Sequence, residues 1–290
     1  MRNKELFQSF CRLIRLDYSL FSGLGVFLSG LLAGDLFGFQ PEYLVAFLIV
    51  FLSAVGSFAL NDYCDFEVDK RNDRSDRPLV SGLLSKELAL ITGSVSFFWV
   101  ILLSFFLNLL AMVLVLASLA LFFLYSLGLK KIFLVKNVLV AYAYVATIFL
   151  GALVSDGVLE PLIVYFALMG FIVGLAVEIM LDIGDIKGDK ELGIDTLAAR
   201  FGLKRAARFC VALYAVIMIL DPLPFFELID PRLYVDYVFL FLIFIPVFSY
   251  FFTSRSLIKD QSKNTVFQLK KRVFVTMQVG CIAYLIGVLI

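Results

Sequence analysis

The chain has 290 residues, of which 62% are hydrophobic and 17% are charged, and its mean hydropathy is +0.98. These values exclude an ordinary soluble domain and indicate an integral membrane protein. The sequence contains no histidine, and its four cysteines form no CxxC pair. Histidine-based catalysis and zinc sites of the Cys/His type are therefore excluded, and nothing in the sequence indicates disulfides.

Nine apolar runs are long enough to cross a membrane as helices. They follow "MRNKELFQSFCRLIRLDYS", which lacks a small-residue cleavage site, so we expect an amphipathic leader and a retained first span. Strict alternation of polar and apolar residues, typical of a lipid-facing barrel, is absent. The sequence predicts an all-α integral membrane protein with spans near residues 19–35, 43–61, 88–107, 109–127, 133–153, 161–181, 206–221, 235–252 and 273–290.

Basic residues lie almost entirely on one side of the predicted spans. The leader and the loops after spans 2, 4, 6 and 8 hold 24 of the 25 Lys and Arg residues, and Arg232 alone lies on the other side. Such asymmetry predicts a multi-pass protein of the cell membrane with this side in the cytoplasm. A basic membrane surface also attracts anionic lipids, and a basic pocket attracts phosphate.

An acidic stripe follows the second span in "LNDYCDFEVDKRNDRSDRPLVSG", residues 60–82. Asp62, Asp65 and Asp69 are spaced i, i+3 and i+7, which places their carboxylates on one face of a helix leaving the membrane. The same spacing recurs 120 residues later in "DIGDIKGDKELGIDTLAARFG", and the offset also relates Lys70 to Lys190 and Gly82 to Gly202. We interpret the chain as two related halves of four helices each, followed by a ninth helix.

The two stripes indicate a metal site. One alternative is that the acids cap helices or pair with neighbouring cations. However, like charges gathered at the negative carboxyl end of a helix repel one another, and the arrangement occurs twice. Oxygen ligands without His or Cys suit Mg²⁺, which binds a few carboxylates together with substrate phosphates.

Two such stripes predict a clamp for a diphosphate. If the substrate is a prenyl diphosphate, apolar helices with 32 Phe would shield the allylic cation.

Both motifs resemble signatures of the UbiA superfamily of intramembrane prenyltransferases. "NDYCDFEVDKRNDRSDRPLVSG" resembles NDxxDxxxD followed by an RPxxSG-type element, and "DIGDIKGDKELGIDTLAARFG" resembles DxxDxxxD. The order of the motifs, their place at helix ends and the nine spans all agree with this family. The resemblance covers residues 1–290, which we expect to form a single polytopic domain. The resemblance implies a nine-helix transmembrane bundle with two cytoplasmic cap loops over a cavity open to lipid.

The resemblance also implies site residues. Two Mg²⁺ ions would be held on the prenyl diphosphate by Asn61, Asp65, Asp69, Asp182, Asp185 and Asp189. Asp62 lies in the first motif, and its alternative role is to fix the loop. Arg77 of the RPxxSG-like element and Arg15 near the first span would contact the diphosphate. Lys190, a cation beside the second motif, is a further candidate for binding it.

The roles of the loop after the fourth span and of Glu178 are left open by the sequence. "YSLGLKK" resembles the Tyr-x-x-x-Lys element of the family with one additional residue, which leaves open whether Lys130 or Lys131 reaches phosphate while Tyr125 hydrogen-bonds or shields it. Asn137 orders the same loop or starts a helix. Glu178 lies one turn inside the membrane from Asp182, where it binds metal indirectly, accepts the acceptor's proton or pairs with a cation.

Within the family, the residues of the two motifs most resemble those of archaeal-type digeranylgeranylglyceryl phosphate synthases. The resemblance implies transfer of geranylgeranyl, or geranyl, from its diphosphate to a lipophilic acceptor, geranylgeranylglyceryl phosphate, in ether-lipid synthesis. The alternative is an aromatic acceptor of quinone biosynthesis, because those relatives share both motifs. An ion-coupled transporter would place its acids near the bilayer midplane, whereas these lie at span ends. No nucleic-acid partner is implied.

Overall fold

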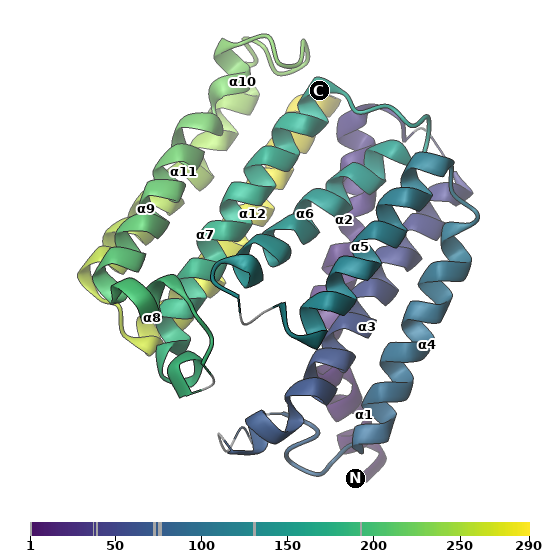
Figure 1. Cartoon of the computed structure of the whole chain (residues 1–290). Helices are drawn as coiled ribbons and strands as arrows, with labels where there is room; N and C mark the ends of the chain where they lie inside the picture. The colour runs from purple at the N-terminus through teal and green to yellow at the C-terminus, as the bar shows by residue number, and fades with distance from the viewer. Residues whose placement is uncertain are drawn as a thin grey trace. The chain divides into compact units, whose positions relative to one another are not determined.

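The computed structural model describes residues 2–36, 38, 40–71, 74, 77–129, 132–191 and 193–290. Within these residues, nine helices are long and apolar enough to cross a membrane (Figure 1), which confirms the all-α membrane class. They are α2 (Leu16–Ala33), α3 (Pro41–Arg71), α4 (Lys86–Ser104), α5 (Leu109–Leu127), α6 (Val135–Leu153), α7 (Pro161–Glu191), α9 (Leu203–Leu220), α11 (Tyr237–Lys259) and α12 (Lys263–Leu289).

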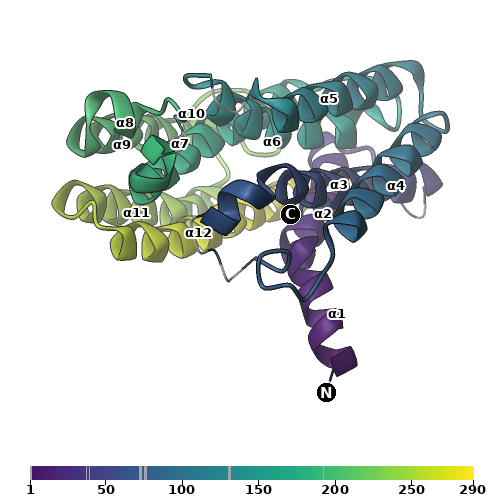
Figure 2. The same cartoon turned by 60° about the horizontal axis from the view of Figure 1, so that its bottom comes forward.

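Three shorter helices complete the described elements: α1 (Arg2–Leu13), α8 (Leu197–Phe201) and α10 (Leu223–Phe226). The expected leader is α1, which precedes α2 (Figure 2). Arg15 separates these two helices and has a φ of 43°. The left-handed region is uncommon for a residue with a Cβ, and Arg15 interrupts the helical conformation between α1 and α2.

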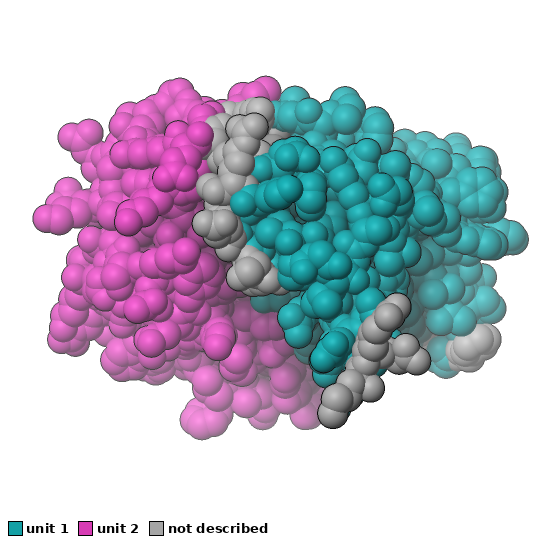
Figure 3. Space-filling view, turned by 90° about the horizontal axis from the view of Figure 1, so that it is seen from below, with its two compact units in different colours: residues 1–30, 34–129, 146–158 teal, residues 31–33, 130–145, 159–290 magenta. Residues whose placement is uncertain are grey.

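The chain divides into two compact units, which we describe separately (Figure 3). Unit 1 consists of Met1–Gly30, Gly34–Leu129 and Ala146–Val158; unit 2 consists of Leu31–Ala33, Lys130–Val145 and Leu159–Ile290. In unit 1, α3 packs against α4 and α5. In unit 2, α11 packs against α12 and α9, while α7 packs against α9 and α12.

Small residues bring α2 and the end of α6 together in unit 1. A Cβ at Gly151 would lie 2.5 Å from the Val26 carbonyl oxygen. Nearby, the Ser29 Oγ donates to the Ile148 carbonyl at 2.5 Å. In a membrane the hydrophobic effect does not drive helices together, so close backbone approach and interhelical hydrogen bonds replace it. Gly151 is therefore a packing residue.

Arg232, the cation that the sequence places apart from all others, closes a loop in unit 2. Its Nη2 donates to Asp230 Oδ2 and to the Leu32 carbonyl, each at 2.7 Å. Burial raises the pKa of Asp230 because it favours the neutral acid. The hydrogen bonds and the charge of Arg232 lower the pKa by more, so that it lies below its ordinary value. This guanidinium therefore joins the α10–α11 loop to the end of α2.

The 120-residue correspondence extends to local structure. Helices α3 and α7 both begin at a proline, both contain 31 residues, and their ends also lie 120 residues apart. Gly82 and Gly202 both have positive φ, 74° and 86°, a conformation that glycine adopts without steric cost. The relation between two complete four-helix halves stays a prediction.

The last span differs from its predicted start. The apolar run begins at residue 273, but α12 begins at Lys263, where Ser262 Oγ accepts a hydrogen bond from the Thr265 amide at 3.4 Å. The basic residues Lys270, Lys271 and Arg272 end the hydropathy signal without ending the helix. A hydropathy window detects the hydrocarbon core, whereas capping determines where a helix starts.

We expect Gly151→Ala to destabilise the protein by about 1–3 kcal/mol, because the added methyl group must displace the backbone of α2. The measurement is thermal unfolding in detergent. Gly280→Ala is the matched control, since a Cβ there would meet Pro246 only at 4.0 Å. Equal unfolding temperatures for both variants would contradict the close approach of α2 and α6.

Candidate functional site

The first acidic motif occupies the end of α3, as its spacing predicts. Helix α3 continues through the motif to Arg71. Asp62 and Asp69 are buried, with 3% and 8% of their surfaces exposed, whereas Asn61 and Asp65 are partly exposed. Burying a carboxylate is costly unless a partner compensates its charge. The partners of the buried acids therefore define the local structure.

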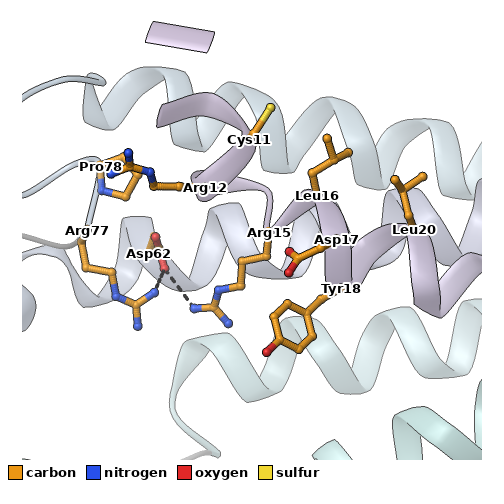
Figure 4. A pocket seen from close by; sticks show the side chains of 10 residues that line it. All are labelled: Cys11, Arg12, Arg15, Leu16, Asp17, Tyr18, Leu20, Asp62, Arg77 and Pro78. Carbon is orange, nitrogen blue, oxygen red and sulfur yellow. Dashed lines mark hydrogen bonds and ion pairs between the residues drawn. The ribbon is translucent and has the colours of Figure 1, made fainter. Parts of the chain in front are cut away.

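Asp62 is held by two arginines (Figure 4). Arg77 Nη1 donates to Asp62 Oδ1 at 2.8 Å, and Arg15 Nη2 lies 3.5 Å from the same oxygen. Arg77 also places its Nε 3.6 Å from Asp69 Oδ2, which is close enough for an ion pair but too long for a hydrogen bond. The first acid of the motif thus holds both arginines and positions Arg77 beside Asp69.

These arginines face an open pocket of about 640 Å³ within unit 1. Helix α1, the start of α2, the end of α3 and the loop after it supply its walls (Figure 4). Its lining residues are Cys11, Arg12, Arg15, Leu16, Asp17, Tyr18, Leu20, Asp62, Arg77 and Pro78. Three guanidinium groups against two carboxylates give the pocket a net positive lining, which suits an anionic group.

Arg15 is held by an aromatic ring as well as by Asp62. Its guanidinium carbon lies 4.4 Å from the centre of the Phe58 ring, within the range of a cation–π contact. Burial and the charge of Arg77 lower its pKa from the ordinary value, while Asp62 and then Tyr125 oppose that shift. Tyr125 of α5 is therefore an electrostatic neighbour of Arg15. Arg15 was predicted to contact diphosphate, and Tyr125 to hydrogen-bond to it or shield it. Lys130 and Lys131 lie outside the described residues.

The second motif occupies the end of α7 in unit 2. Asp182 is 1% exposed. Its Oδ1 accepts a hydrogen bond from Lys136 Nζ, and its Oδ2 accepts one from Asn137 Nδ2 at 2.8 Å. Both donors come from the first turn of α6, 46 and 45 residues earlier in the chain. Asn137 therefore fixes the motif from the start of a helix.

The remaining acids of the second motif differ in exposure. Asp185 and Lys190 are exposed, and Glu178 is partly exposed one turn before Asp182. Asp189 is buried, and its Oδ2 has no hydrogen-bond partner in the part of the chain that the structure describes. A buried carboxylate oxygen without a donor is costly, and a bound cation would satisfy it.

The two motifs share one pattern of burial and pairing. In each, the first acid is buried and ion-paired, Asp62 with two arginines and Asp182 with Lys136, the second is the most exposed, and the third is buried. The acids that follow Asp62 and Asp182 provide oxygen donors only, which fits Mg²⁺. Asp62 and Asp182 occupy equivalent positions, although the sequence interpretation treated only Asp182 as a metal ligand.

Sequence reasoning did not identify Lys136 as a site residue. It counted this lysine among the cytoplasmic cations and looked for the functional lysine at Lys130 or Lys131. Its position directly before Asn137, at the start of a span, was the available signal. Recognising the pair with Asp182 requires knowing that the start of α6 packs against the end of α7.

Comparisons with known proteins identify the family of this chain. The model of the UbiA prenyltransferase family matches residues 22–274. The digeranylgeranylglyceryl phosphate synthase of Saccharolobus solfataricus is 31% identical over 282 residues, covering 97% of this chain and 96% of that protein.

Two solved structures share the fold. One, from work on digeranylgeranylglyceryl phosphate synthase in membranes, has a TM-score of 0.76 at 24% identity and covers 98% of this chain and 99% of its own. Another, a UbiA homologue from Archaeoglobus fulgidus bound to DMAPP and Mg²⁺, has a TM-score of 0.69 at 18% identity, covering 95% of this chain and 99% of its own. On its motifs, its fold and this family match, the chain belongs to the UbiA prenyltransferase family.

Proposed function

We propose that the protein transfers a geranylgeranyl group from its diphosphate to the free hydroxyl of geranylgeranylglyceryl phosphate, in ether-lipid synthesis. The observation that carries the proposal is the pair of acidic helix ends, each with a buried acid neutralised by cations beside further oxygen donors. Relatives named digeranylgeranylglyceryl phosphate synthase, which match over almost the whole chain, support the choice of acceptor.

The proposed metal ligands are Asn61, Asp65, Asp69, Asp182, Asp185 and Asp189. The homologue bound to DMAPP and Mg²⁺ supports magnesium as the metal and a prenyl diphosphate as the substrate. Bound Mg²⁺ neutralises the diphosphate and stabilises it as a leaving group. The oxygen of Asp189 that lacks a hydrogen-bond donor and the exposed carboxylate of Asp185 suit such a role, because both can accept a further cation.

The cationic residues have a complementary role. Arg15 and Arg77 would donate charge-assisted hydrogen bonds to phosphate oxygens, and Asp62 holds both guanidinium groups in position before substrate binds. Tyr125, Lys190 and either Lys130 or Lys131 are the further phosphate contacts that we propose. The net positive pocket around Arg15 supports this assignment.

Ionisation of the allylic carbon–oxygen bond leaves a carbocation that the acceptor hydroxyl attacks. The apolar spans would exclude water, and the negative faces of aromatic rings favour a cation. A reactive carbocation needs little activation of the hydroxyl, so the proton leaves late, to diphosphate or to Glu178. Glu178 lies one turn from Asp182 and within electrostatic range of Lys136 and Lys270.

We propose that this chemistry takes place on the cytoplasmic side of the cell membrane. The distribution of basic residues supports the orientation, because 24 of 25 lie in the leader and the loops on one side of the spans. The motif-bearing ends of α3 and α7 belong to that side.

Asp65→Ala and Asp185→Ala should each lower turnover by more than about 100-fold, the scale on which preorganised groups stabilise a developing charge. Thermal unfolding should be unchanged, because neither side chain is buried. Asp195→Ala is the matched control, since Asp195 and its partner Arg200 lie beyond the DxxDxxxD residues 182–189 and their side chains are 36% and 47% exposed. Near-wild-type rates in either motif variant would remove that motif from the metal site.

Lys136→Met should destabilise the protein by about 3–5 kcal/mol, because it leaves the buried Asp182 carboxylate without its cation. The double variant Lys136→Met with Asp182→Asn should recover much of this loss but remain inactive if Asp182 also binds Mg²⁺. Thermal unfolding and single-turnover assays measure the two effects separately. Full activity in the double variant would show that Asp182 only positions the motif.

The acceptor assignment predicts that geranylgeranylglyceryl phosphate is prenylated far better than geranylgeranylglycerol. Loss of a charge-assisted contact to the acceptor phosphate should lower kcat/KM by more than about 10-fold. Product formation measured by mass spectrometry distinguishes the substrates. Equal efficiency with both, or turnover only with 4-hydroxybenzoate or a dihydroxynaphthoate, would move the assignment to the aromatic branch of the family.

A further inference from the structure

A second open pocket of about 630 Å³ lies between α11 and α12, within unit 2. We call it the α11–α12 groove; it is lined chiefly by Ile245, Phe248, Phe252, Arg255, Lys259 and Arg272. None of these residues belongs to either acidic motif or to the cations that hold the motifs. Its function must therefore be sought apart from the proposed transfer chemistry.

The groove is apolar at one end and cationic at the other. Its α11 residues recur every three or four positions, so they form one stripe along the helix. Ile245, Phe248 and Phe252 are 50%, 58% and 52% exposed, although they lie within a membrane span. Arg255 and Lys259 continue the same stripe to the helix end, about 10 Å beyond Phe252 at the rise of an α-helix. This gradient matches a lipid chain followed by its headgroup.

The cations of the groove are not compensated by acids. Among the described residues, neither Arg255, Lys259 nor Arg272 forms an ion pair with a carboxylate. Asp260 is adjacent in sequence, but it accepts hydrogen bonds from the Ser262 amide and hydroxyl, each at 2.9 Å, and from Thr265. Its carboxylate therefore stabilises the α11–α12 turn. The three cations give the lining of the groove a net charge of +3, which suits an anion.

We propose that the α11–α12 groove binds one anionic membrane lipid. The phosphate lies among Arg255, Lys259 and Arg272, and a hydrocarbon chain runs along Phe252, Phe248 and Ile245. Basic pockets between membrane helices on the cytoplasmic side are suited to phosphate headgroups, and each cation near the surface adds to the attraction. The positive-inside pattern alone requires cations on this side, but it does not require three of them around an exposed aromatic stripe.

Quenching of tryptophan by brominated lipids tests this proposal on the complete protein. Trp99 is the single tryptophan of the chain, so Trp99→Phe combined with Phe252→Trp gives a reporter inside the groove. The protein is reconstituted in vesicles of phosphatidylcholine that contain increasing fractions of brominated phosphatidylglycerol or brominated phosphatidylcholine. Because both lipids are compared at the same tryptophan, the depth of that tryptophan in the bilayer affects both quenching measurements equally.

We expect brominated phosphatidylglycerol to bind at the groove reporter severalfold more tightly than phosphatidylcholine. Arg272→Gln should weaken that preference roughly fivefold, and Arg272→Lys should retain most of it. Lys271→Gln is the matched control, because Lys271 is exposed at the same level of α12 but does not line the groove. The native Trp99, 49% exposed on α4, should show little preference.

Several results would overturn the proposal. They are equal quenching by both lipids at the groove reporter, an unchanged preference in Arg272→Gln, and an equal loss in Lys271→Gln. Displacement by geranylgeranylglyceryl phosphate, but not by phosphatidylglycerol, would instead make the groove a substrate site. Thermal unfolding of each variant identifies a loss of preference that comes from misfolding.

Discussion

Neutralisation of buried carboxylates is the constraint on which the proposed site depends. A carboxylate removed from water at the end of a membrane helix needs a cation and hydrogen-bond donors close to it. Arg77 and Arg15 supply them for Asp62, and Lys136 with Asn137 supplies them for Asp182. Each buried acid thereby ties its helix end to another segment: the loop after α3 in one unit, and the start of α6 in the other.

This tethering also places the cations that the proposed chemistry needs. Arg15 lies at the left-handed junction between α1 and α2, with its guanidinium over Phe58. A long flexible side chain ordinarily loses conformational entropy when it binds a ligand. The ion pair with Asp62 and the ring contact restrict Arg15 before any phosphate arrives, so less of that entropy remains to be lost.

The sequence predicted the class of fold and the helices that carry the acids, because both depend on local patterns. Long apolar runs define spans, and the i, i+3, i+7 spacing places Asp62, Asp65 and Asp69 on one face. The partners of these acids could not be predicted in the same way. Lys136 and Asp182 are 46 residues apart, and only tertiary packing brings them together.

The start of α12 and the α11–α12 groove were missed for related physical reasons. Lys270, Lys271 and Arg272 interrupt the apolar run, yet the helix passes through them because its first turn is capped at Ser262. Arg272 and Arg255 belong to different helices, and they line one pocket only because α11 and α12 pack together. Charge counts along the chain report topology, whereas a pocket depends on which faces meet.

The number of spans between the starts of α3 and α7 has a consequence for evolution. Between Pro41 and Pro161 the described chain contains four membrane-spanning helices: α3, α4, α5 and α6. An even number of crossings returns the chain to the side from which it started, so α7 crosses in the same direction as α3. Gain or loss of a single span between them would reverse α7 and leave the two acidic helix ends on opposite sides of the bilayer. Parity therefore restricts gain or loss of helices between α3 and α7 to pairs.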